Sequence, residues 1–303
     1  MDALTRMIQM TRPQASLDLR CQLSGTFDIP HEPAPTGTAP FHLVLAGSCQ
    51  IATDKGLLTA RAGDFILFPR GGAHVIRDHD AQGDDGVMRM RYDGMLPLRR
   101  AGKGKVGSDL LCGHFTHAGE AAELLFKTLP DPLQVSLSDE GATESLKALV
   151  TLMHQEASGT SPGALAIVTA LSQTLLVLAL RRYTERPERD AGILAVMTDA
   201  RLGASAQAVL DAPGQPWTIE GLGKLAAMSR ASYARRFQQA SGMTVFEFLT
   251  RVRMAVACEL LRTTRRKVGD ICFEVGYQSE AAFGKAFKLQ IGELPGQYRR
   301  RHA

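Results

Sequence analysis

The sequence predicts an α+β protein in which a β-rich part precedes an all-helical, basic part. Residues 15–115 contain short apolar runs separated by Gly, Pro and Asp turns, a pattern typical of an antiparallel barrel or sandwich. From residue 143 onward the apolar residues recur with helical spacing. Residues 214–303 carry 15 Lys and Arg against 7 Asp and Glu, which favours a polyanionic partner.

Length and composition narrow the class of protein. A chain of 303 residues suggests two domains, and 45% apolar with 22% charged residues excludes global disorder. Five cysteines in a chain of this length do not indicate a disulfide scaffold. No signal-peptide pattern opens the chain, and residues 164–180 are too short and too polar to span a membrane comfortably. We therefore expect a cytoplasmic protein with no membrane partner.

Two helices are expected after the β-rich part. Leu146, Val150 and Met153 share one face of a helix over residues 143–156. Ser161-Pro162 is an N-cap followed by a first-turn proline, which predicts a second helix that runs to residue 183. The charged, Pro-containing stretch 184–190 then reads as a linker.

An internal repeat of 50 residues marks the basic part. The repeat superposes Ser229 on Ser279, Tyr233 on Phe283, Phe237 on Phe287 and Gly242 on Gly292. Each copy predicts a short helix, a tight turn and a second helix. In the second helix, Ser is the N-cap, Gly ends the helix and the aromatic side chains point inward to the core. A helix over residues 245–262, about 27 Å long, would separate the copies by nearly one DNA turn of roughly 34 Å. The sequence thus predicts paired helix-turn-helix units, with a protein-binding helical bundle as the alternative.

Residues 217–301 resemble the DNA-binding domain of AraC/XylS-type transcription regulators. The most specific match is the second unit, from Ile271 through Val275-Gly276-Tyr277 and Phe287-Lys288 to Pro295. Leu294 departs from the family, which usually has Thr before this proline. The resemblance implies a homodimer that binds double-stranded promoter DNA and contacts RNA polymerase. It also implies that the second helix of each unit enters the major groove.

The resemblance further implies a set of DNA-contacting residues. Arg suits guanine and Gln suits adenine, whereas Arg266, between the units, suits a phosphate. The implied DNA-binding residues are Ser229, Arg230, Ser232, Arg235, Arg236, Arg266, Gln278, Ser279, Glu280, Ala281 and Lys285. Each of these positions could instead be a solvated surface residue.

The segment from Gly63 to His74 has the spacing G-x5-P-x-G-x2-H, the second sequence motif of cupin barrels. The segment 41–47, with His42, resembles a reduced first motif. Val44 replaces the second His of that motif and no Glu follows, so the usual cupin metal set is incomplete. This argues against a metal-dependent cupin enzyme fused to a DNA-binding tail, and we expect no catalytic residues.

Cys21, His42, His74 and Cys112 are the remaining chemically informative residues of the β-rich part. Two Cys and two His form a complete tetrahedral zinc set if the fold brings them together, so zinc is a candidate cofactor. The alternative is that the thiols are small buried hydrophobes and the imidazoles ordinary barrel residues. His31 shows no spacing to a partner, and Cys258 and Cys272 fall on apolar helix faces that predict a core role.

The layout before residue 143 resembles cupin-sensor AraC-type regulators, most of all the subgroup that responds to reactive chlorine and related oxidants. The matching features are the Met1–Leu4 start, Cys21, Pro30-His31, His42, the 63–74 motif and Cys112-Gly113. The resemblance implies that Cys21 is the redox-sensing thiol and Cys112 a second one. The function expected is that of an oxidant-controlled activator. A regulator whose barrel binds a small organic effector is the alternative.

The expected organisation follows from these assignments. It comprises a cupin-like sensor barrel over 1–142, dimerisation helices over 143–183, a linker over 184–199 and a double helix-turn-helix domain over 200–303.

Overall fold

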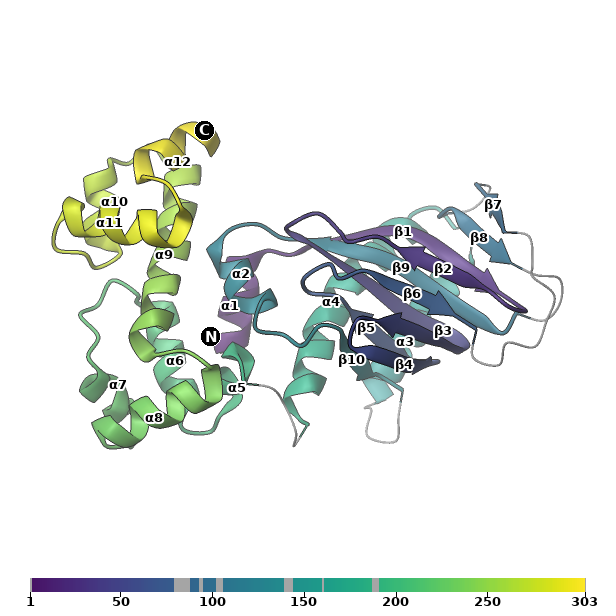
Figure 1. The fold of residues 1–303 in the computed structure, drawn as a ribbon, viewed down its shortest axis with the longest axis horizontal. Coiled ribbons are helices and arrows are strands. Elements are labelled where there is room, and N and C mark those ends of the chain that lie inside the picture. Colours follow the sequence, from purple (N-terminus) through teal and green to yellow (C-terminus); the bar gives the residue numbers. More distant parts are fainter. Residues whose placement is uncertain are drawn as a thin grey trace. The chain divides into compact units, whose positions relative to one another are not determined.

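The computed structural model describes residues 2–78, 88–92, 95–101, 106–138, 144–159, 161–186 and 191–302. Contacts divide the chain into two compact units, each drawn in Figure 1. The sheet unit comprises Pro13–His117 and Pro130–Pro187, and the helical unit comprises Met1–Arg12, Ala118–Leu129 and Glu188–Ala303. The predicted α+β class, with a cupin-like curled sheet followed by helix-turn-helix units, is confirmed. Of the expected linker, residues 187–190 lie outside the described residues.

The sheet unit is built around β1 (Gln14–Leu23), β3 (Thr38–Thr53) and β9 (Ser108–Thr116), with β9 antiparallel to both neighbours. The other strands are β2 (Asp28–His31), β4 (Gly56–Arg61), β5 (Asp64–Leu67), β6 (His74–Arg77), β7 (Arg89–Arg91), β8 (Leu98–Ala101) and β10 (Leu133–Ser136). The main path runs β10-β5-β3-β9-β1-β8-β7, while β4 and β6 pair with β3, and β2 pairs with β6.

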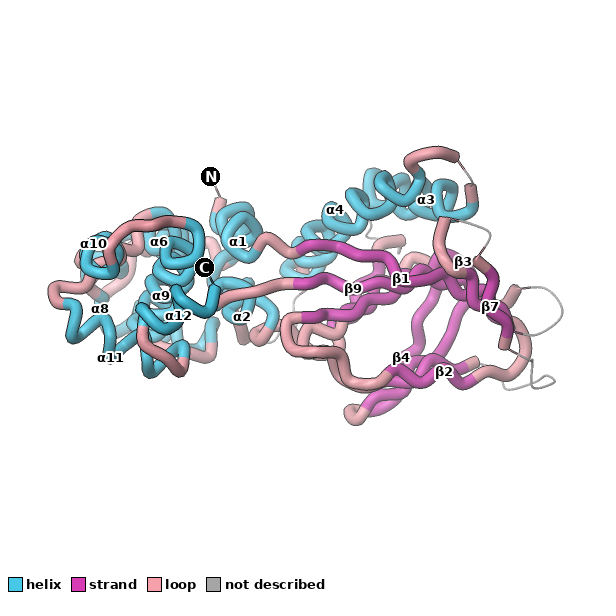
Figure 2. Tube along the Cα trace, turned by 90° about the horizontal axis from the view of Figure 1, so that it is seen from above, coloured by secondary structure: helices cyan, strands magenta, loops and turns pink. Residues whose placement is uncertain are grey.

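The long strand β3 curls the sheet. Its first part pairs with β9 and β5, and its last part pairs with β4 and β6. Pairing with β9 has a register shift between Val44 and Ala46 and ends at Gly47, which has φ 75°, and pairing with β4 begins at Ser48. A Cβ at Gly47 would lie 1.7 Å from the Gly107 carbonyl oxygen, so only glycine fits this bend. As a result β2 and β4 face β1 and β9 across a buried apolar core (Figure 2).

Two helices cover the outer side of this sheet. α3 (Glu144–Ser158) and α4 (Ala164–Thr184) pack on each other, and α4 also contacts β1 and β10. The predicted start of α4 at Ser161 is corrected. The N-cap is Gly163, whose φ of 86° is left-handed and therefore interrupts the helix before Ala164. By length and composition alone α4 is long and apolar enough to cross a membrane, and 39% of that apolar window is buried.

The helical unit contains the predicted repeat. Its helices are α1 (Ala3–Thr11), α2 (Glu120–Phe126), α5 (Ile193–Thr198), α6 (Leu202–Asp211), α7 (Ile219–Leu225), α8 (Arg230–Ser241), α9 (Val245–Thr263), α10 (Val268–Glu274), α11 (Glu280–Ile291) and α12 (Pro295–His302). The aromatics Tyr233, Phe237, Phe283 and Phe287 are buried, as the repeat predicts. Cys258 and Cys272 belong to the core around α9, so their predicted core role is confirmed.

Two helices from outside the repeat complete this unit. α1 packs against α6, and α2 packs against α9. Arg12, which ends α1, forms an ion pair of 3.1 Å with Glu259 of α9. By their packing, the segments that flank β1 and β9 in the sequence therefore belong to the helical unit.

Candidate functional site

The two helix-turn-helix units present α8 and α11 as their second helices. Ser229 Oγ accepts a hydrogen bond from the Ser232 backbone N–H at 3.3 Å, and Ser279 Oγ accepts the equivalent bond from Ala282 at 3.3 Å. Gly242 and Gly292 end these helices in the left-handed conformation. Both predicted caps and both predicted stops are therefore confirmed, because local hydrogen bonding alone determines them.

Most of the predicted DNA-contacting residues belong to these two helices or cap them, whereas Arg266 lies between α9 and α10. Arg235 and Lys285 are exposed, and Ser232 is the only half-buried member of the implied set. Arg236 donates to Asp199 Oδ2 at 2.6 Å, and Arg266 is ion-paired with Glu274. Those two arginines would have to exchange a carboxylate for DNA. The DNA-binding assignment stays a prediction for each residue.

A pair of thiols bridges the central strands of the sheet unit. Cys21 on β1 and Cys112 on β9 are both buried, and a hydrogen bond joins their side chains. Register pairs Cys21 with Leu110 and Leu19 with Cys112, so the two cysteines occupy diagonal positions. The hydrogen bond with Cys112 lowers the pKa of Cys21 and outweighs the opposing effect of burial. The same interaction with Cys21, together with burial, raises the pKa of Cys112.

Three histidine side chains lie next to the thiol pair, and one of them contacts Cys112. His42 Nδ1 lies 3.1 Å from Cys112 Sγ, and His42 Nε2 lies 2.8 Å from His74 Nε2. His31 completes the group, since its ring stacks on that of His74 with centroids 4.5 Å apart. One nitrogen from each of His31, His42 and His74 lies within 4.8 Å of the other two.

Backbone partners indicate which nitrogen of each ring carries the proton. His74 Nδ1 lies 3.0 Å from the Gly72 carbonyl oxygen, and His31 Nδ1 lies 3.1 Å from that of Ile29. Only an N–H can bond a carbonyl, so both Nε2 atoms are left with lone pairs. Burial lowers the pKa of His31 to about 4 and also lowers those of His42 and His74, so all three rings are neutral at pH 7. The Nε2 atoms of His42 and His74 lie 2.8 Å apart, so a proton or a cation must lie between them. The three rings therefore fit a metal ion.

The predicted four-residue zinc set is only partly assembled. Cys112 and His74 contact opposite nitrogens of the His42 ring, so one ion cannot take all three in this arrangement. The set of Cys21, His42, His74 and Cys112 stays a prediction that would need the His42 ring to turn. Sequence reasoning missed His31 because the pairing of β2 with β6 places it opposite His74. The Pro30-His31 pair was the only available signal.

The other cysteines lie in environments that suppress thiolate formation. Burial raises the pKa of Cys49 and that of Cys258 to about 12, and it also raises that of Cys272. Cys21 is therefore the one cysteine of the five whose pKa is lowered. A lowered pKa is the property that makes a thiol reactive toward oxidants.

Known proteins resemble this chain over its whole length. A cupin family model matches residues 2–185, and a helix-turn-helix domain model matches residues 222–301. An uncharacterized HTH-type transcriptional regulator of Haemophilus influenzae is 33% identical, covering 99% of both chains. A putative AraC-like transcription regulator of Streptomyces lividans is 31% identical, covering 99% of this chain and 97% of the relative.

A third relative carries a more specific name. The RCS-specific HTH-type transcriptional activator RclR of Escherichia coli K12 is 28% identical, covering 99% of this chain and 98% of its own. The two matched family models correspond to the curled sheet with its helices and to the paired helix-turn-helix units. The chain belongs to the AraC family of DNA-binding transcription regulators that carry an N-terminal cupin domain.

Proposed function

We propose that this chain is a transcription activator whose action at its promoter is controlled by oxidation of Cys21. The observation that carries this proposal is the contact between the Cys21 and Cys112 thiols, which lowers the pKa of Cys21. The relative RclR, which is named as an RCS-specific activator, supports both the sign of regulation and the class of oxidant. The thiol pair lies on the two central strands of the sheet, where a chemical change has structural consequences.

The chemistry balances with a two-electron oxidant such as hypochlorous acid. The Cys21 thiolate attacks the oxidant, and the oxidised sulfur becomes a sulfenic acid as chloride leaves. The Cys112 sulfur then attacks Cys21, a disulfide forms and water leaves. Two thiols and one hypochlorous acid thus give one disulfide, one water, one chloride and one proton. Cys112 is the resolving thiol in this scheme.

Formation of this disulfide would displace one strand against the other. Diagonal positions of an antiparallel pair have Cα atoms about 7–8 Å apart, whereas a disulfide usually requires about 4.4–6.8 Å. The Cys21–Cys112 bond therefore draws β1 along or toward β9. Gly113 already allows a close approach of the two strands, because a Cβ there would lie 2.4 Å from the Ser16 carbonyl oxygen.

The two displaced strands are covalently continuous with the helical unit. β1 begins at Gln14, two residues after the Arg12 that ends α1, and β9 ends at Thr116, shortly before α2 at Glu120. α1 and α2 pack on α6 and α9, and α9 joins the two helix-turn-helix units. We propose that the strain passes along these two connections and alters how α8 and α11 bind DNA.

The remaining features of the proposal concern zinc and partners. Zinc bound by His31, His42 and His74 would place the proton of His42 on Nδ1, facing Cys112. The protonation states of the Cys21 and Cys112 thiols would then be fixed. The exposed apolar residues Leu165 and Ile167 of α4 support burial of this helix in a homodimer rather than in a membrane. Contact with RNA polymerase and a cytoplasmic location follow from the proposed role.

The decisive experiment is a reporter driven by the promoter adjacent to the gene, treated with hypochlorous acid. Cys21→Ser should fold and bind DNA but lose the oxidant response, whereas the matched control Cys258→Ser should respond like wild type. Mass mapping of oxidised peptides should find Cys21 modified before Cys258 or Cys272, as their pKa values require. A wild-type response from Cys21→Ser would refute the redox switch and leave the small organic effector as the better account.

A further inference from the structure

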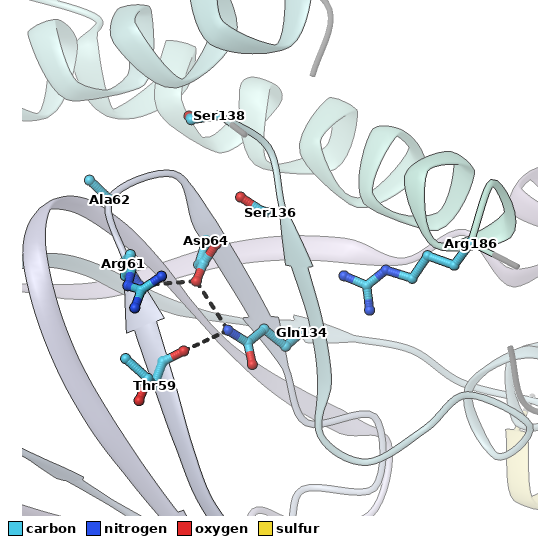
Figure 3. Close-up of a pocket in the computed structure, with 8 residues that line it drawn as sticks. All are labelled: Thr59, Arg61, Ala62, Asp64, Gln134, Ser136, Ser138 and Arg186. Atoms are coloured by element: carbon cyan, nitrogen blue, oxygen red, sulfur yellow. Dashed lines mark hydrogen bonds between the residues drawn. The ribbon is translucent and has the colours of Figure 1, made fainter. Parts of the chain in front are cut away.

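A polar cavity of about 530 Å³ lies in the sheet unit, and its described lining residues include none of Cys21, Cys112, His31, His42 and His74. Its walls come from β4, β5, β10 and the residues that follow α4. In Figure 3, Arg61 lies on one side of the view, and Arg186 extends from the end of α4 toward the strand that carries Gln134 and Ser136. Among the described residues that line the cavity, Ala62 alone has an apolar side chain, so the cavity suits a polar molecule.

The Asp64 carboxylate in this cavity forms its hydrogen bonds with groups other than the Arg61 and Arg186 guanidinium groups. Asp64 is 7% exposed, and its Oδ2 accepts from the Arg61 backbone N–H at 3.0 Å and from Gln134 Nε2 at 3.0 Å. Gln134 Nε2 also donates to the Thr59 carbonyl oxygen at 2.8 Å. These bonds fix the Asp64 carboxylate and the Gln134 amide within the wall.

The two arginines, by contrast, keep their binding capacity. Within the part of the chain that the structure describes, neither the Arg61 nor the Arg186 guanidinium has an ion-pair or side-chain hydrogen-bond partner. Both side chains are exposed to the cavity, and the hydroxyls of Ser136 and Ser138 lie in the same lining. With Asp64 opposing two arginines, the lining carries one net positive charge among the described residues.

Gly63 allows two segments of the cavity wall to lie in close contact. Gly63 has φ 87°, and a Cβ there would lie 2.1 Å from Ser138 Oγ. The Gly63 carbonyl oxygen also accepts a hydrogen bond from the Leu137 backbone N–H at 2.9 Å. The β4–β5 turn and the residues after β10 therefore meet at a fixed distance, which holds Arg61 and Ser138 on adjoining walls.

We propose that this cavity binds a small hydroxylated anion, with Arg61 and Arg186 holding its carboxylate or phosphate groups. Planar guanidinium groups bind such groups through two hydrogen bonds, and the serine hydroxyls are placed to bond the ligand's hydroxyl groups. The site is distinct from the Cys21 switch, and neither proposal depends on the other.

The position of Arg186 gives this binding a consequence. Arg186 comes two residues after the end of α4 at Thr184, and the last segment of the helical unit begins at Glu188. A ligand held by both Arg61 and Arg186 ties the end of α4 to β4. Such a ligand would act on the chain at its last passage from the sheet unit to the helical unit, so the cavity serves as a second effector site.

The test uses the full-length protein at constant ionic strength, with citrate and inorganic phosphate as separate calorimetric titrants. We expect saturable binding of at least one of them to wild type, and citrate above phosphate identifies a hydroxycarboxylate as the ligand class. Arg61→Gln and Arg186→Gln should each weaken the affinity at least tenfold. The matched control Arg77→Gln, which removes an exposed arginine paired with Asp28, should bind like wild type.

Circular dichroism melting of each variant verifies folding, so that a lost signal reports on the site. The proposal is overturned if neither anion saturates wild type, or if the two cavity variants bind as tightly as Arg77→Gln. Binding to Cys21→Ser should equal binding to wild type, which separates this result from any failure of the redox proposal.

Discussion

Arg20 and Asp109 form a bidentate ion pair beside Cys21, with Arg20 Nε 2.8 Å from Asp109 Oδ1 and Arg20 Nη2 2.6 Å from Asp109 Oδ2. Arg20 is the chain neighbour of Cys21, and both charged side chains are buried. Arg20 Nη1 also donates to the Ala157 carbonyl oxygen of α3 at 2.9 Å. One side chain thus joins β1, β9 and α3 around the Cys21 position.

This pair leads to a prediction about stability. Arg20→Met leaves the Asp109 carboxylate buried without its cation, which should lower the free energy of unfolding by about 3–5 kcal/mol. The double variant Arg20→Met/Asp109→Leu should recover most of that loss, because no buried charge then lacks a partner. Urea unfolding of the single and double variants measures both values. Equal destabilisation in the single and double variants would contradict this account.

Zinc content distinguishes the two candidate ligand sets. Wild-type protein should contain about one zinc per chain. His31→Ala should reduce it at least tenfold because His31 supplies one of three converging nitrogens, while His114→Ala, a half-exposed histidine paired with Asp18, should not. Elemental analysis after dialysis gives the measurement. Zinc retained in His31→Ala but lost from Cys21→Ser would instead favour the set with two thiols.

Base recognition should depend on exposed, unengaged side chains of α8 and α11. Replacing Arg235 or Lys285 by Ala should cost about 1–3 kcal/mol at the preferred site and relax specificity there. Arg266→Ala should weaken all sequences alike and lower the salt dependence by about one charge. Binding titrations on cognate and random DNA at several salt concentrations separate these effects. Identical behaviour of the three variants would invalidate the assignment of reading positions.

The proposed dimer makes a prediction for α4. Leu165 and Ile167 are 44% and 41% exposed, so glutamates at both positions should leave the fold intact but prevent burial of this face. Sedimentation of the double variant should give a monomer where wild type gives a dimer. Leu57→Glu, which places the same charge on an exposed leucine of β4, is the control. A dimeric Leu165→Glu/Ile167→Glu protein would exclude this face as the interface.

Local patterns predicted the helix-turn-helix units well. The caps at Ser229 and Ser279 and the buried aromatics of α8 and α11 depend on residues within four positions of one another, so their signals are visible in the sequence. The Gly63–His74 motif likewise predicted a barrel turn, and His74 lies at the start of β6.

Long-range pairing accounts for what sequence reasoning did not find. His31 meets His74 only through the register of β2 with β6, and no local pattern encodes a register between distant strands. The diagonal placement of Cys21 and Cys112 depends in the same way on the shift between Leu17 and Leu19 in β1. The packing of α1 on α6 and of α2 on α9 was also not predicted, because the apolar pattern of a helix does not indicate which surface the helix packs against.

That packing of α1 and α2 has a consequence for engineering and for evolution by gene fusion. The chain passes between the two units at four places, after residues 12, 117, 129 and 187. A chimera that joins a foreign sensor to residues 188–303 would lack Met7, Leu124 and Leu125, which are buried in the intact protein. The apolar surfaces of α6 and α9 would then meet water. Exchangeable modules in this architecture are therefore not contiguous segments, and a working hybrid must transplant residues 2–12 and 118–129 together with the carboxy-terminal helices.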